Sequence, residues 1–509
     1  MDYRSADLAA RIEEANIYAV ATRTSLHRAP MLSDRLSNRI LLKREDQQPT
    51  FSFKVRGAAN KIQRLPESEV IRGVICSSAG NHAQGVALAA ARRGIPAHIV
   101  MPETSAEIKV RAVEALGGRV QLVGDSYDDA QRVAYERSEA EGLCFVHPFD
   151  DLDVIAGQGT IGREILDQGP DDIAAVFVPV GGGGLAAGIA TYLKVRRPGV
   201  RVYGVEPADA ASMQAALKSG GPITLEHVGT FADGVAVKRV GDTTFELCRQ
   251  HLDGVITVST DELCAGIRDI FDDTRTLVEP AGALAVAGIR RYVEETGAEG
   301  ENLVAINCGA NMNFNRLGHV AERTAVGDKR EALLAVGIPE RRGSFLQFCR
   351  AIGSRHVTEF NYRRYDARQA RIFVGLELLP GAADRHSLID HLEEVGYSVT
   401  DLTDNELAKL HVRHLAGGPS SDVNHERLLR FEFPERRGAL LRFLESVGID
   451  WNITLFHYRN HGSDYGRVLV AVEVPPETSD EFDRHLEDLG YRFWDETDNE
   501  AYALFLRGA

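Results

Sequence analysis

One lysine in this chain stands in a context that can support covalent chemistry. Lys54 lies within Ser52–Ala58, just after an apolar, strand-like run at Ile40–Lys43 and just before a stretch with helical periodicity. A lysine at a strand-to-helix turn can face inward with its amine removed from water, which lowers its pKa and frees the amine to attack a carbonyl group. Most lysines are solvated surface residues, so the segments that accompany this motif decide its meaning.

A second segment, Ser77–Gly85, consists mainly of small and polar residues between a strand-like run and a helix-like run. Backbone N–H groups at such a turn can point at an anion, helped by the dipole of the helix that follows. A substrate carboxylate would suit this position, and the amide of Asn81 can donate a hydrogen bond to a phenolic oxygen of a cofactor. A tight turn with a helix cap explains the same residues without any ligand.

Four consecutive glycines, Gly181–Gly184, directly follow the apolar run Val176–Val180. Such a run has a heavy conformational entropy cost, which is understandable if the backbone must wrap a phosphate at a helix N-terminus. No Lys-Ser pair follows, which excludes a Walker loop, and the third glycine of a dinucleotide fingerprint is missing. A flexible hinge is the alternative explanation.

Three further segments carry polar or reactive groups near expected element ends. Cys308 follows the apolar run Leu303–Ile306; alone it reads as a core thiol, but it can also face a pyridine nitrogen and leave that nitrogen largely unprotonated. Glu279–Ala283 opens a helix-like run, and helix initiation explains it as well as a direct role does. The loop Phe231–Ala236 is made mostly of small residues and can close over a substrate.

The elements that must position these residues alternate between apolar runs and helical periods from about residue 37 to residue 325. Near-continuous apolar runs are typical of strands buried on both faces, so the pattern predicts an α/β fold with mostly parallel sheets. Such sheets bind ligands at the carboxyl ends of their strands. The expected strands are Ile40–Lys43, Val74–Cys76, Ala97–Val100, Val120–Val123, Val176–Val180, Val202–Val205 and Leu303–Ile306, and the expected helices include Gln84–Arg93, Ser105–Leu116 and Ala281–Val293.

The last part of the chain contains an internal repeat. Pro-Glu-Arg-Arg-Gly occurs at Pro339–Gly343 and again at Pro434–Gly438, and Thr-Asp-Asn-Glu occurs at Thr403–Glu406 and again at Thr497–Glu500. The spacing of about 95 residues indicates a duplication. Each copy reads as strand, helix, strand, strand, helix, strand, which is a ferredoxin-like α+β order. We expect a catalytic domain at residues 1–325, followed by modules at residues 326–413 and 414–509.

The composition excludes several classes of function. The chain has 509 residues, a formal net charge of −16 and 26% charged residues, which argues against a nucleic-acid binder. We see no run of about 18 apolar residues and no signal or transit segment, and therefore expect no membrane association. The six cysteines are scattered without a metal-type pair, so we expect reduced thiols in a cytoplasm and no metal site.

Together, in this order and at this spacing, the four segments around Lys54, Asn81, the glycine run and Cys308 resemble the fold-type II pyridoxal-phosphate enzymes. That fold is tryptophan synthase β-like, with two parallel-sheet lobes. Within this group the chain is similar to the long, allosteric threonine deaminases (threonine ammonia-lyases), which add two ACT-like regulatory modules. The resemblance covers nearly the whole chain and implies a pyridoxal 5'-phosphate cofactor.

The resemblance also implies roles for individual residues. Lys54 forms the internal aldimine and then acts as the general base. Ala79 matches a position where related serine racemases carry a serine that reprotonates the α-carbon, and an alanine there favours elimination. Cys308 faces the pyridine nitrogen, where many family members have serine. The other implied contacts are Phe53 with the cofactor ring, Asn81 with its phenolic oxygen, Gly181, Gly182, Gly183, Gly184 and Leu185 with its phosphate, and Ser78, Ala79, Gly80, Asn81 and His82 with the substrate.

The implied reaction converts L-threonine to 2-oxobutanoate and ammonia, the first committed step of isoleucine biosynthesis, with L-serine as a poorer substrate. Selection by one methyl group is worth about 1–3 kcal/mol, so it should be incomplete. The resemblance further implies inhibition by isoleucine, opposition by valine and a homotetramer. Effector contacts are expected at Phe345, Tyr362, Leu440 and Tyr458, although all four can equally be core residues.

Other readings remain open at this point. A β-replacement enzyme, a threonine synthase or a racemase can be built on the same fold, and a non-catalytic amino-acid sensor can use the repeats alone. Ala79 and the paired modules speak against a racemase, and Lys54 speaks against a sensor. A cation site near Glu206 and Ala210, as in related racemases, is conceivable but unassigned.

Overall fold

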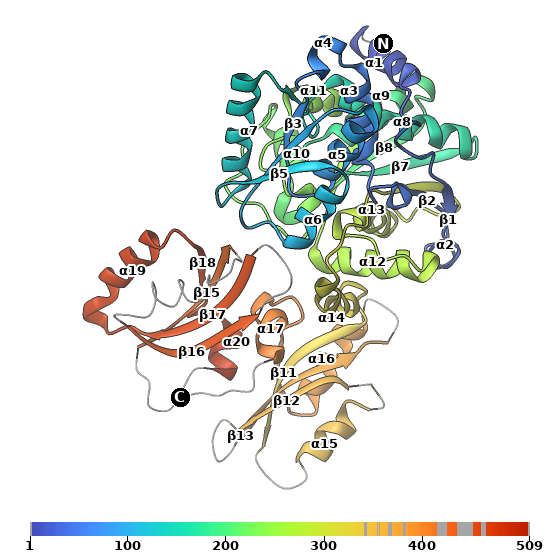
Figure 1. Ribbon diagram of the computed structural model, residues 1–509. Helices are drawn as coiled ribbons and strands as arrows, with labels where there is room; N and C mark the ends of the chain where they lie inside the picture. Colours follow the sequence, from blue (N-terminus) through green and yellow to red (C-terminus); the bar gives the residue numbers. More distant parts are fainter. Residues whose placement is uncertain are drawn as a thin grey trace. The chain divides into compact units, whose positions relative to one another are not determined.

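The computed structural model describes residues 3–339, 344–353, 355, 357–364, 369–379, 383–414, 425–434, 451–459 and 465–506. The chain divides into two compact units, Met1–Phe314 and Asn315–Ala509 (Figure 1). The first is an α/β unit and the second is built on antiparallel sheets, as the sequence predicts. Within the described residues, no helix is both long and apolar enough to span a bilayer.

The first unit contains two sheets, which define a large and a small lobe. The large-lobe sheet has six strands in the order β1-β2-β10-β7-β8-β9, and all neighbours are parallel except β1 and β2. The small-lobe sheet has four parallel strands in the order β5-β4-β3-β6. The strands are β1 (Leu26–Arg28), β2 (Arg39–Arg44), β3 (Val74–Ser77), β4 (Ala97–Met101), β5 (Gly118–Leu122), β6 (Cys144–Phe145), β7 (Ile173–Pro179), β8 (Arg201–Pro207), β9 (Gly254–Val258) and β10 (Asn302–Asn307).

Helices surround both sheets of this unit (Figure 1). Strands β3 and β10 are buried along their whole length, which is why their sequences read as continuous apolar runs. The helices are α1 (Tyr3–Glu14), α2 (Pro30–Arg35), α3 (Lys54–Arg64), α4 (Glu67–Val70), α5 (Asn81–Arg93), α6 (Glu107–Ala115), α7 (Tyr127–Glu141), α8 (Leu152–Gln168), α9 (Gly184–Arg196), α10 (Ser212–Ser219), α11 (Asp242–His251), α12 (Thr260–Thr274) and α13 (Pro280–Thr296), with 3-10 turns η1 (Glu45–Gln47), η2 (Ala208–Ala210), η3 (Asp233–Val235) and η4 (Phe314–Arg316).

Helix α3, which begins at Lys54, is packed closely against α5 and α8. A Cβ atom on Gly85 of α5 would lie 3.0 Å from the backbone nitrogen of Val55. A Cβ atom on Gly157 of α8 would lie 2.5 Å from the backbone oxygen of Arg56. Only glycine permits backbones to approach so closely, so these two positions fix α3 between its neighbours.

Four buried charged side chains anchor the same helix to the large lobe. Arg56 is fully buried and pairs with Glu45 at 2.7 Å and with Glu164 at 2.6 Å. Lys43 on β2 pairs with the second oxygen of Glu164 at 2.6 Å. The two positive and two negative charges balance, which is the condition under which such groups tolerate burial. These four side chains connect β2, η1, α3 and α8, and Arg56 lies two residues after Lys54 on α3.

The second unit contains two four-stranded antiparallel sheets, in the orders β12-β13-β11-β14 and β16-β17-β15-β18. The first copy has the predicted strand and helix order; in the second copy, the segment between β15 and β16 lies outside the described residues. The elements are α14 (Leu317–Gly327), β11 (Glu331–Pro339), α15 (Ser344–Ala351), β12 (Val357–Arg364), β13 (Gln369–Glu377), α16 (Asp384–Glu394), β14 (Ser398–Asp401), α17 (Glu406–Leu410), η5 (Val412–His414), β15 (Glu426–Pro434), β16 (Asn452–Arg459), β17 (Tyr465–Glu473), η6 (Pro476–Thr478), α19 (Ser479–Asp488), β18 (Arg492–Asp495) and α20 (Glu500–Phe505).

The two copies meet through short helices that follow each repeated Thr-Asp-Asn-Glu motif. Helices α17 and α20 share one apolar core with strand residues from both sheets, including Leu333, Phe373 and Leu469 (Figure 1). Asn405 and Asn499 cap these helices, and the Nδ2 atom of Asn405 lies 3.3 Å from the Oδ1 atom of Asn499. The duplicated motif therefore builds a pseudo-symmetric seam inside this unit.

The expected effector contacts fall largely outside what the structure describes. Phe345, Tyr362 and Tyr458 lie on α15, β12 and β16, but their side chains are not among the described ones. Leu440 lies wholly outside the described residues. These four contacts and the domain boundaries at residues 325 and 413 stay predictions.

Candidate active site

The segments singled out in the sequence lie at the carboxyl ends of parallel strands. β3 ends at Ser77 and leads through Ser78–Gly80 into α5. β7 ends at Pro179 and leads through the glycine run into α9, and β10 ends at Asn307, directly before Cys308. This is the edge at which open α/β sheets bind ligands.

The segment before Lys54 is held directly against the segment that contains Cys308. The backbone N–H of Phe53 donates to the carbonyl oxygen of Cys308 at 3.1 Å, and the N–H of Ala310 donates to the oxygen of Phe51 at 2.8 Å. Ser52 and Gly309 form an antiparallel bridge between these bonds. Residues far apart in the sequence are thereby fixed side by side, with Lys54 one step beyond the bridge.

The amine of Lys54 is surrounded largely by protein atoms, although the residue as a whole is partly exposed. Its Nζ atom donates to the carbonyl oxygen of Pro148 at 2.8 Å and lies 5.4 Å from the centre of the Phe53 ring. Desolvation lowers the pKa of Lys54 to about 8, although the nearby Cys308 and Glu279 act in the opposite direction. The amine therefore loses its proton more readily than that of a solvated lysine, as a nucleophilic or basic amine requires.

Asn81 begins α5 and has a polar partner on each side of its amide. Its Nδ2 atom donates to Oε1 of Glu279 at 2.6 Å, and its Oδ1 atom accepts from Nδ2 of Asn311 at 2.6 Å. No side chain caps the first turn of α5, so its N–H groups are available for an anion. Glu279 is 4% exposed, and burial, with the charge of Asp233, raises its pKa to about 7.

The other residues of the predicted carboxylate loop differ in accessibility. The Oγ atom of Ser78 accepts from the backbone N–H of Gly80 at 3.2 Å, and Ser78, Ala79 and Gly80 are partly exposed. His82 is buried and its Nε2 atom lies 2.8 Å from the carbonyl oxygen of Val146, so that nitrogen carries the proton. Burial lowers the pKa of His82 to about 3, which keeps the ring neutral.

The glycine run is required by its surroundings at every position. A Cβ atom on Gly182 would lie 2.2 Å from the Phe149 ring, and one on Gly184 would lie 2.8 Å from the Phe149 carbonyl oxygen. Gly183 has a φ of 97°, in the left-handed region that favours glycine. No side chain caps the start of α9, so the loop presents a helix N-terminus suited to a phosphate, with Leu185 buried in its first turn.

Cys308 is buried, and its Sγ atom lies 3.2 Å from the carbonyl oxygen of Ala281, to which the thiol donates. Burial, together with the charge of Glu279, raises the thiol pKa well above its ordinary value. The group is therefore neutral throughout the physiological range. A neutral thiol is the kind of group that would leave a pyridine nitrogen unprotonated, and the position of Cys308 at that nitrogen stays a prediction.

Comparisons with known proteins agree with this geometry. Residues 17–309 match the family described as pyridoxal-phosphate dependent enzyme, and residues 322–412 and 417–506 match the C-terminal regulatory domain of threonine dehydratase. The chain is 53% identical to the biosynthetic L-threonine dehydratase of Burkholderia multivorans over 505 residues, with 99% of both chains covered. It is 52% identical to that of Escherichia coli over 494 residues, with 97% of this chain and 96% of the other covered.

The chain belongs to the biosynthetic threonine dehydratase family. Among solved structures, the processed form of threonine deaminase isoform 2 from Solanum lycopersicum is 48% identical, with a TM-score of 0.62, and covers 64% of this chain and 94% of that chain. Maize serine racemase is 31% identical, with a TM-score of 0.58, and covers 62% of this chain and 96% of that chain. The fold is therefore that of the fold-type II pyridoxal-phosphate enzymes, and the cofactor of this threonine dehydratase family member is pyridoxal phosphate.

The residues present fit that cofactor. The glycine run leaves no space for side chains and frames an uncapped helix N-terminus, which suits a phosphate group. The Lys54 amine has a lowered pKa, which suits attack on an aldehyde. Cys308 supplies a neutral group in a neighbouring segment, joined to the lysine segment by backbone hydrogen bonds.

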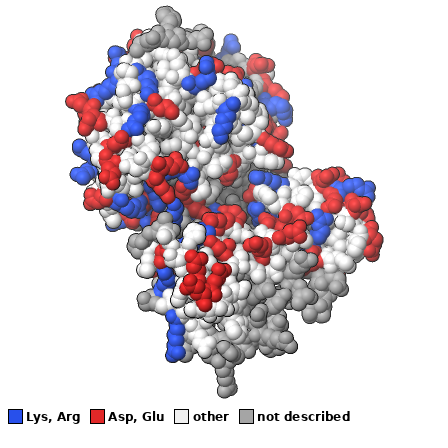
Figure 2. Space-filling model, turned by 180° about the vertical axis from the view of Figure 1, so that it is seen from behind, with Lys and Arg blue, Asp and Glu red and all other residues white. Residues whose placement is uncertain are grey.

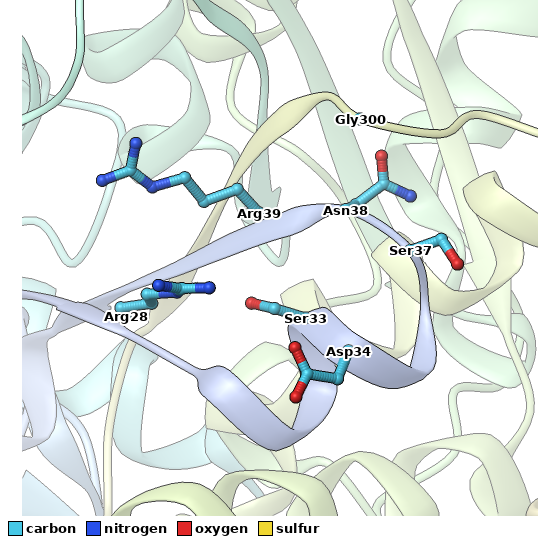
Figure 3. A pocket seen from close by; sticks show the side chains of 7 residues that line it. All are labelled: Arg28, Ser33, Asp34, Ser37, Asn38, Arg39 and Gly300. Atoms are coloured by element: carbon cyan, nitrogen blue, oxygen red, sulfur yellow. The ribbon is translucent and has the colours of Figure 1, made fainter.

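Two other features do not form part of this site: one is a pocket of the first unit, and the other is the charge distribution on one face of the chain. An open pocket of about 540 Å³ lies at the opposite, amino-terminal ends of β2 and β10 (Figure 3). Its buried polar side chains are already paired: Ser33 donates to the oxygen of Ala29, and Asn38 donates to the oxygen of Ala298. Among the described residues of the face shown in Figure 2, acidic and basic side chains are interspersed and form no extended basic surface.

The contacts of Glu206 give no support to a cation site near Glu206 and Ala210. Both carboxylate oxygens of Glu206 accept backbone N–H groups, from Met213 at 2.7 Å and Gln214 at 2.9 Å. The side chain thus caps α10. Among the described residues there is no group of three or more His, Cys, Asp or Glu side chains arranged to hold a metal ion.

Some residues of the site carry no signal in the sequence. Pro148 supplies the carbonyl oxygen next to Lys54, Phe149 packs on the glycine run, and Asp150 accepts from the N–H of Thr244. Asn311 fixes Asn81. Helix initiation explains Glu279 in the sequence as well as a direct role does, but in the structure its carboxylate makes no cap bond to α13 and contacts Asn81 instead.

Proposed function

We propose that this chain converts L-threonine to 2-oxobutanoate and ammonia as the first committed step of isoleucine biosynthesis. The family relationship supports the reaction, because the similarity to biosynthetic threonine dehydratases covers both units of the chain. The observation that carries the proposal is the Lys54 amine, which has a pKa near 8 and lies beside the Cys308 segment.

Pyridoxal phosphate, when bound, supplies an aldehyde and a ring that withdraws electrons from the α-carbon of an amino acid. Lys54 provides the amine that holds the cofactor and, once displaced by substrate, takes the α-proton at Nζ. Cys308 keeps a neutral thiol at the pyridine nitrogen, so the nitrogen gains no carboxylate partner. Phe53 and Asn81 contact the ring and its phenolic oxygen, and Gly181–Gly184 with Leu185 bind the phosphate.

The substrate is held by the loop Ser78–His82. The uncapped N–H groups at the start of α5 receive its carboxylate, which favours L-amino acids with a free carboxyl group. Ala79 has no hydroxyl group and cannot return a proton to the opposite face of the α-carbon. Elimination is therefore favoured over racemisation, and serine is processed more poorly than threonine because one methyl contact is lost.

The second unit is proposed to bind isoleucine as an inhibitor and valine as its antagonist. Support comes from the match of residues 322–412 and 417–506 to the regulatory domain of threonine dehydratase. We assign modules to residues 326–413 and 414–509, with effector contacts at Phe345, Tyr362, Leu440 and Tyr458. Coupling requires two states with different effector affinity, which a homotetramer can provide.

Reduced thiols such as Cys76 and Cys264 favour the cytoplasm as the location of this chain.

One assay on the purified, cofactor-loaded protein tests these proposals. L-threonine is added alone, and release of 2-oxobutanoate is followed with and without isoleucine. Release that isoleucine suppresses is the expected result. Formation of a β-substituted amino acid in place of 2-oxobutanoate, once a second nucleophile is added, would indicate a β-replacement enzyme. Appearance of D-allo-threonine would indicate a racemase, and no turnover with intact effector binding would indicate a sensor.

A further inference from the structure

A row of amide hydrogen bonds determines which way the Asn81 side chain is turned. The backbone oxygen of Thr50 can only accept, so the atom of Asn311 that lies 2.8 Å from it must be the amide nitrogen. The same nitrogen lies 2.6 Å from Asn81, which therefore presents its oxygen on that side. The Nδ2 atom of Asn81 then faces Glu279. The orientation thus follows from a backbone carbonyl and is not an arbitrary assignment.

The carboxylate at the end of this row is confined to one place. Glu279 is buried, and its own N–H donates to the carbonyl oxygen of Gly309 at 3.2 Å. A Cβ atom on Gly309 would lie 2.4 Å from Oε1 of Glu279, and one on Gly234 would lie 3.4 Å from it. A side chain at Gly309 would displace the carboxylate, whereas one at Gly234 would only come into contact with it.

Helix initiation does not account for Glu279. Helix α13 begins with Pro280 at its first position, and the Glu279 side chain makes no capping bond to it. Its Oε1 atom is instead used to accept from Asn81 across nearly 200 residues of sequence. A buried carboxylate that accepts from the Asn81 amide and from the backbone N–H of Asn311 is expensive to maintain unless those bonds have a use.

We propose that Glu279 and Asn311 are positioning residues for the cofactor: they hold the Asn81 amide so that its remaining N–H meets the phenolic oxygen of bound pyridoxal phosphate. Asn81 has two N–H bonds, of which Glu279 receives one. Without Glu279 and Asn311, the amide can rotate and present its oxygen to the phenolic oxygen, which repels it. The inference rests on the role proposed above for Asn81.

Full-length protein carrying Glu279→Ala, Asn81→Ala or both tests the proposal through a double-mutant cycle on cofactor affinity. The dissociation constant for pyridoxal phosphate and the visible absorbance spectrum of the bound cofactor are measured for each. Glu279→Ala alone should weaken binding by about 10-fold and shift the spectrum. In the Asn81→Ala background, the same substitution should add almost nothing. Asn311→Ala should behave like Glu279→Ala.

Two further variants keep the test decisive. Glu279→Gln retains the shape and one acceptor oxygen, so it should fold and lose less affinity than Glu279→Ala. Glu262→Gln, which removes a carboxylate from the first turn of α12 where it pairs with Arg291, should leave affinity and spectrum unchanged. An unchanged spectrum and affinity in Glu279→Ala and Glu279→Gln, or equal losses with and without Asn81, would overturn the inference.

The outcome also separates this inference from the proposed function. A wild-type protein that binds the cofactor and releases 2-oxobutanoate, but tolerates Glu279→Ala and Asn311→Ala with unchanged affinity and spectrum, refutes only the positioning role. A wild-type protein that does not convert threonine refutes the function itself. Unchanged affinity and spectrum in Asn81→Ala would refute the positioning role through its premise, while threonine turnover would still support the function.

Discussion

The Nζ atom of Lys109 lies 2.9 Å from Oδ2 of Asp233, and this ion pair joins α6 of the small lobe to η3 of the large lobe. Next to Asp233, a Cβ atom on Gly234 would lie 3.9 Å from Nδ2 of Asn81. The loop that carries the pair therefore covers the contact between Asn81 and Glu279. Because both partners are partly exposed, the pair adds little stability, and its effect on Glu279 is electrostatic.

Substitutions of Lys109 and Asp233 should shift the titration of Glu279 in opposite directions. The charge of Asp233 raises the pKa of Glu279 and that of Lys109 lowers it, around a value of about 7. Lys109→Met should therefore raise this pKa and Asp233→Asn should lower it. The measurement is the absorbance of the bound cofactor as a function of pH. The titration step that belongs to Glu279 is the one that disappears in Glu279→Gln, and its midpoint is compared between the variants.

Other charges near Glu279 must stay constant in that experiment. Lys54 and Cys308 also sense its charge, and neither is changed by these substitutions. Arg111→Met on α6 removes an exposed charge that pairs with Glu107 and should leave the midpoint unchanged. Midpoints that move in the same direction in both variants would contradict the prediction.

Lys54→Ala should abolish threonine turnover and the visible absorbance of the cofactor bound through this lysine. Alanine is the best helix former, so α3 should still begin at this residue, and far-ultraviolet circular dichroism should be unchanged. Lys54→Arg should also be inactive, because a guanidinium stays protonated. Turnover by either variant at a rate close to that of the wild type would show that another group provides the amine.

Cys308→Ser and Cys308→Asp should have opposite consequences. The serine hydroxyl can donate to the oxygen of Ala281 as the thiol does, so turnover should change by only a few-fold. Aspartate would introduce a charge and favour protonation of the pyridine nitrogen, which should slow elimination by orders of magnitude and alter the cofactor spectrum. Loss of activity in Cys308→Ser, with the cofactor still bound, would rule out a purely electronic role for this position.

Arg56→Met should destabilise the first unit by about 3–5 kcal/mol, because it leaves Glu45 and Glu164 buried beside a single lysine. Urea unfolding followed by circular dichroism measures the loss. Arg23→Met is the control, since its pair with Asp167 is about half exposed, and it should cost under about 1 kcal/mol. A similar loss for both variants would mean that burial of these four charged side chains has no special energetic weight.

The cost of Arg56→Met should also depend on pH. Burial alone would raise the pKa of Glu164, but the hydrogen bonds and charges of Arg56 and Lys43 outweigh it and hold the pKa below its ordinary value of 4.5. A carboxyl group with a lowered pKa contributes stability above its unfolded pKa and loses it as the pH falls through the folded one. The difference between the wild type and Arg56→Met should therefore shrink as the pH falls below 4.5.

The sequence predicts the buried strands and the relative order of the site segments well, because both depend on local pattern. The run Val176–Val180 corresponds to β7 at Ile173–Pro179, and Ala281–Val293 corresponds to α13. The sequence does not predict strands β1, β6 and β9, since the first two have three residues or fewer and β9, at the sheet edge, has only a short apolar run that Thr257 interrupts. Short or edge strands owe their form to pairing partners, which local sequence does not reveal.

The connections within the site depend on contacts between distant residues and could not be read from the sequence. Asn311 meets Asn81 across 230 positions, and Pro148 meets Lys54 across 94 positions. Likewise, the repeated motifs indicate the duplication, but they do not predict the seam at α17 and α20. Those helices have five and six residues, too few to show a helical period.

Removal of residues 330–509 should abolish inhibition by isoleucine while threonine turnover persists. The first unit has its own sheets and its own buried core, so it should fold without these residues. The measurement is 2-oxobutanoate release over a range of isoleucine concentrations. Inhibition that persists in the shortened protein would place the effector site in the first unit.

A substitution in the seam tests whether inhibition by isoleucine needs the two copies to keep their arrangement, or only the presence of the second unit. Tyr502 is fully buried in the core shared by both copies, and its hydroxyl donates to Oε2 of Glu426 at 2.6 Å. Tyr502→Ala leaves a cavity there and should cost about 3–5 kcal/mol of that unit's stability. Because the two copies then lose their fixed arrangement, isoleucine should inhibit less, whereas turnover without isoleucine should match the wild type. Tyr502→Phe keeps the ring and should retain most of the isoleucine response, so an equal loss in both variants would assign the response to the hydroxyl bond and not to packing of the seam.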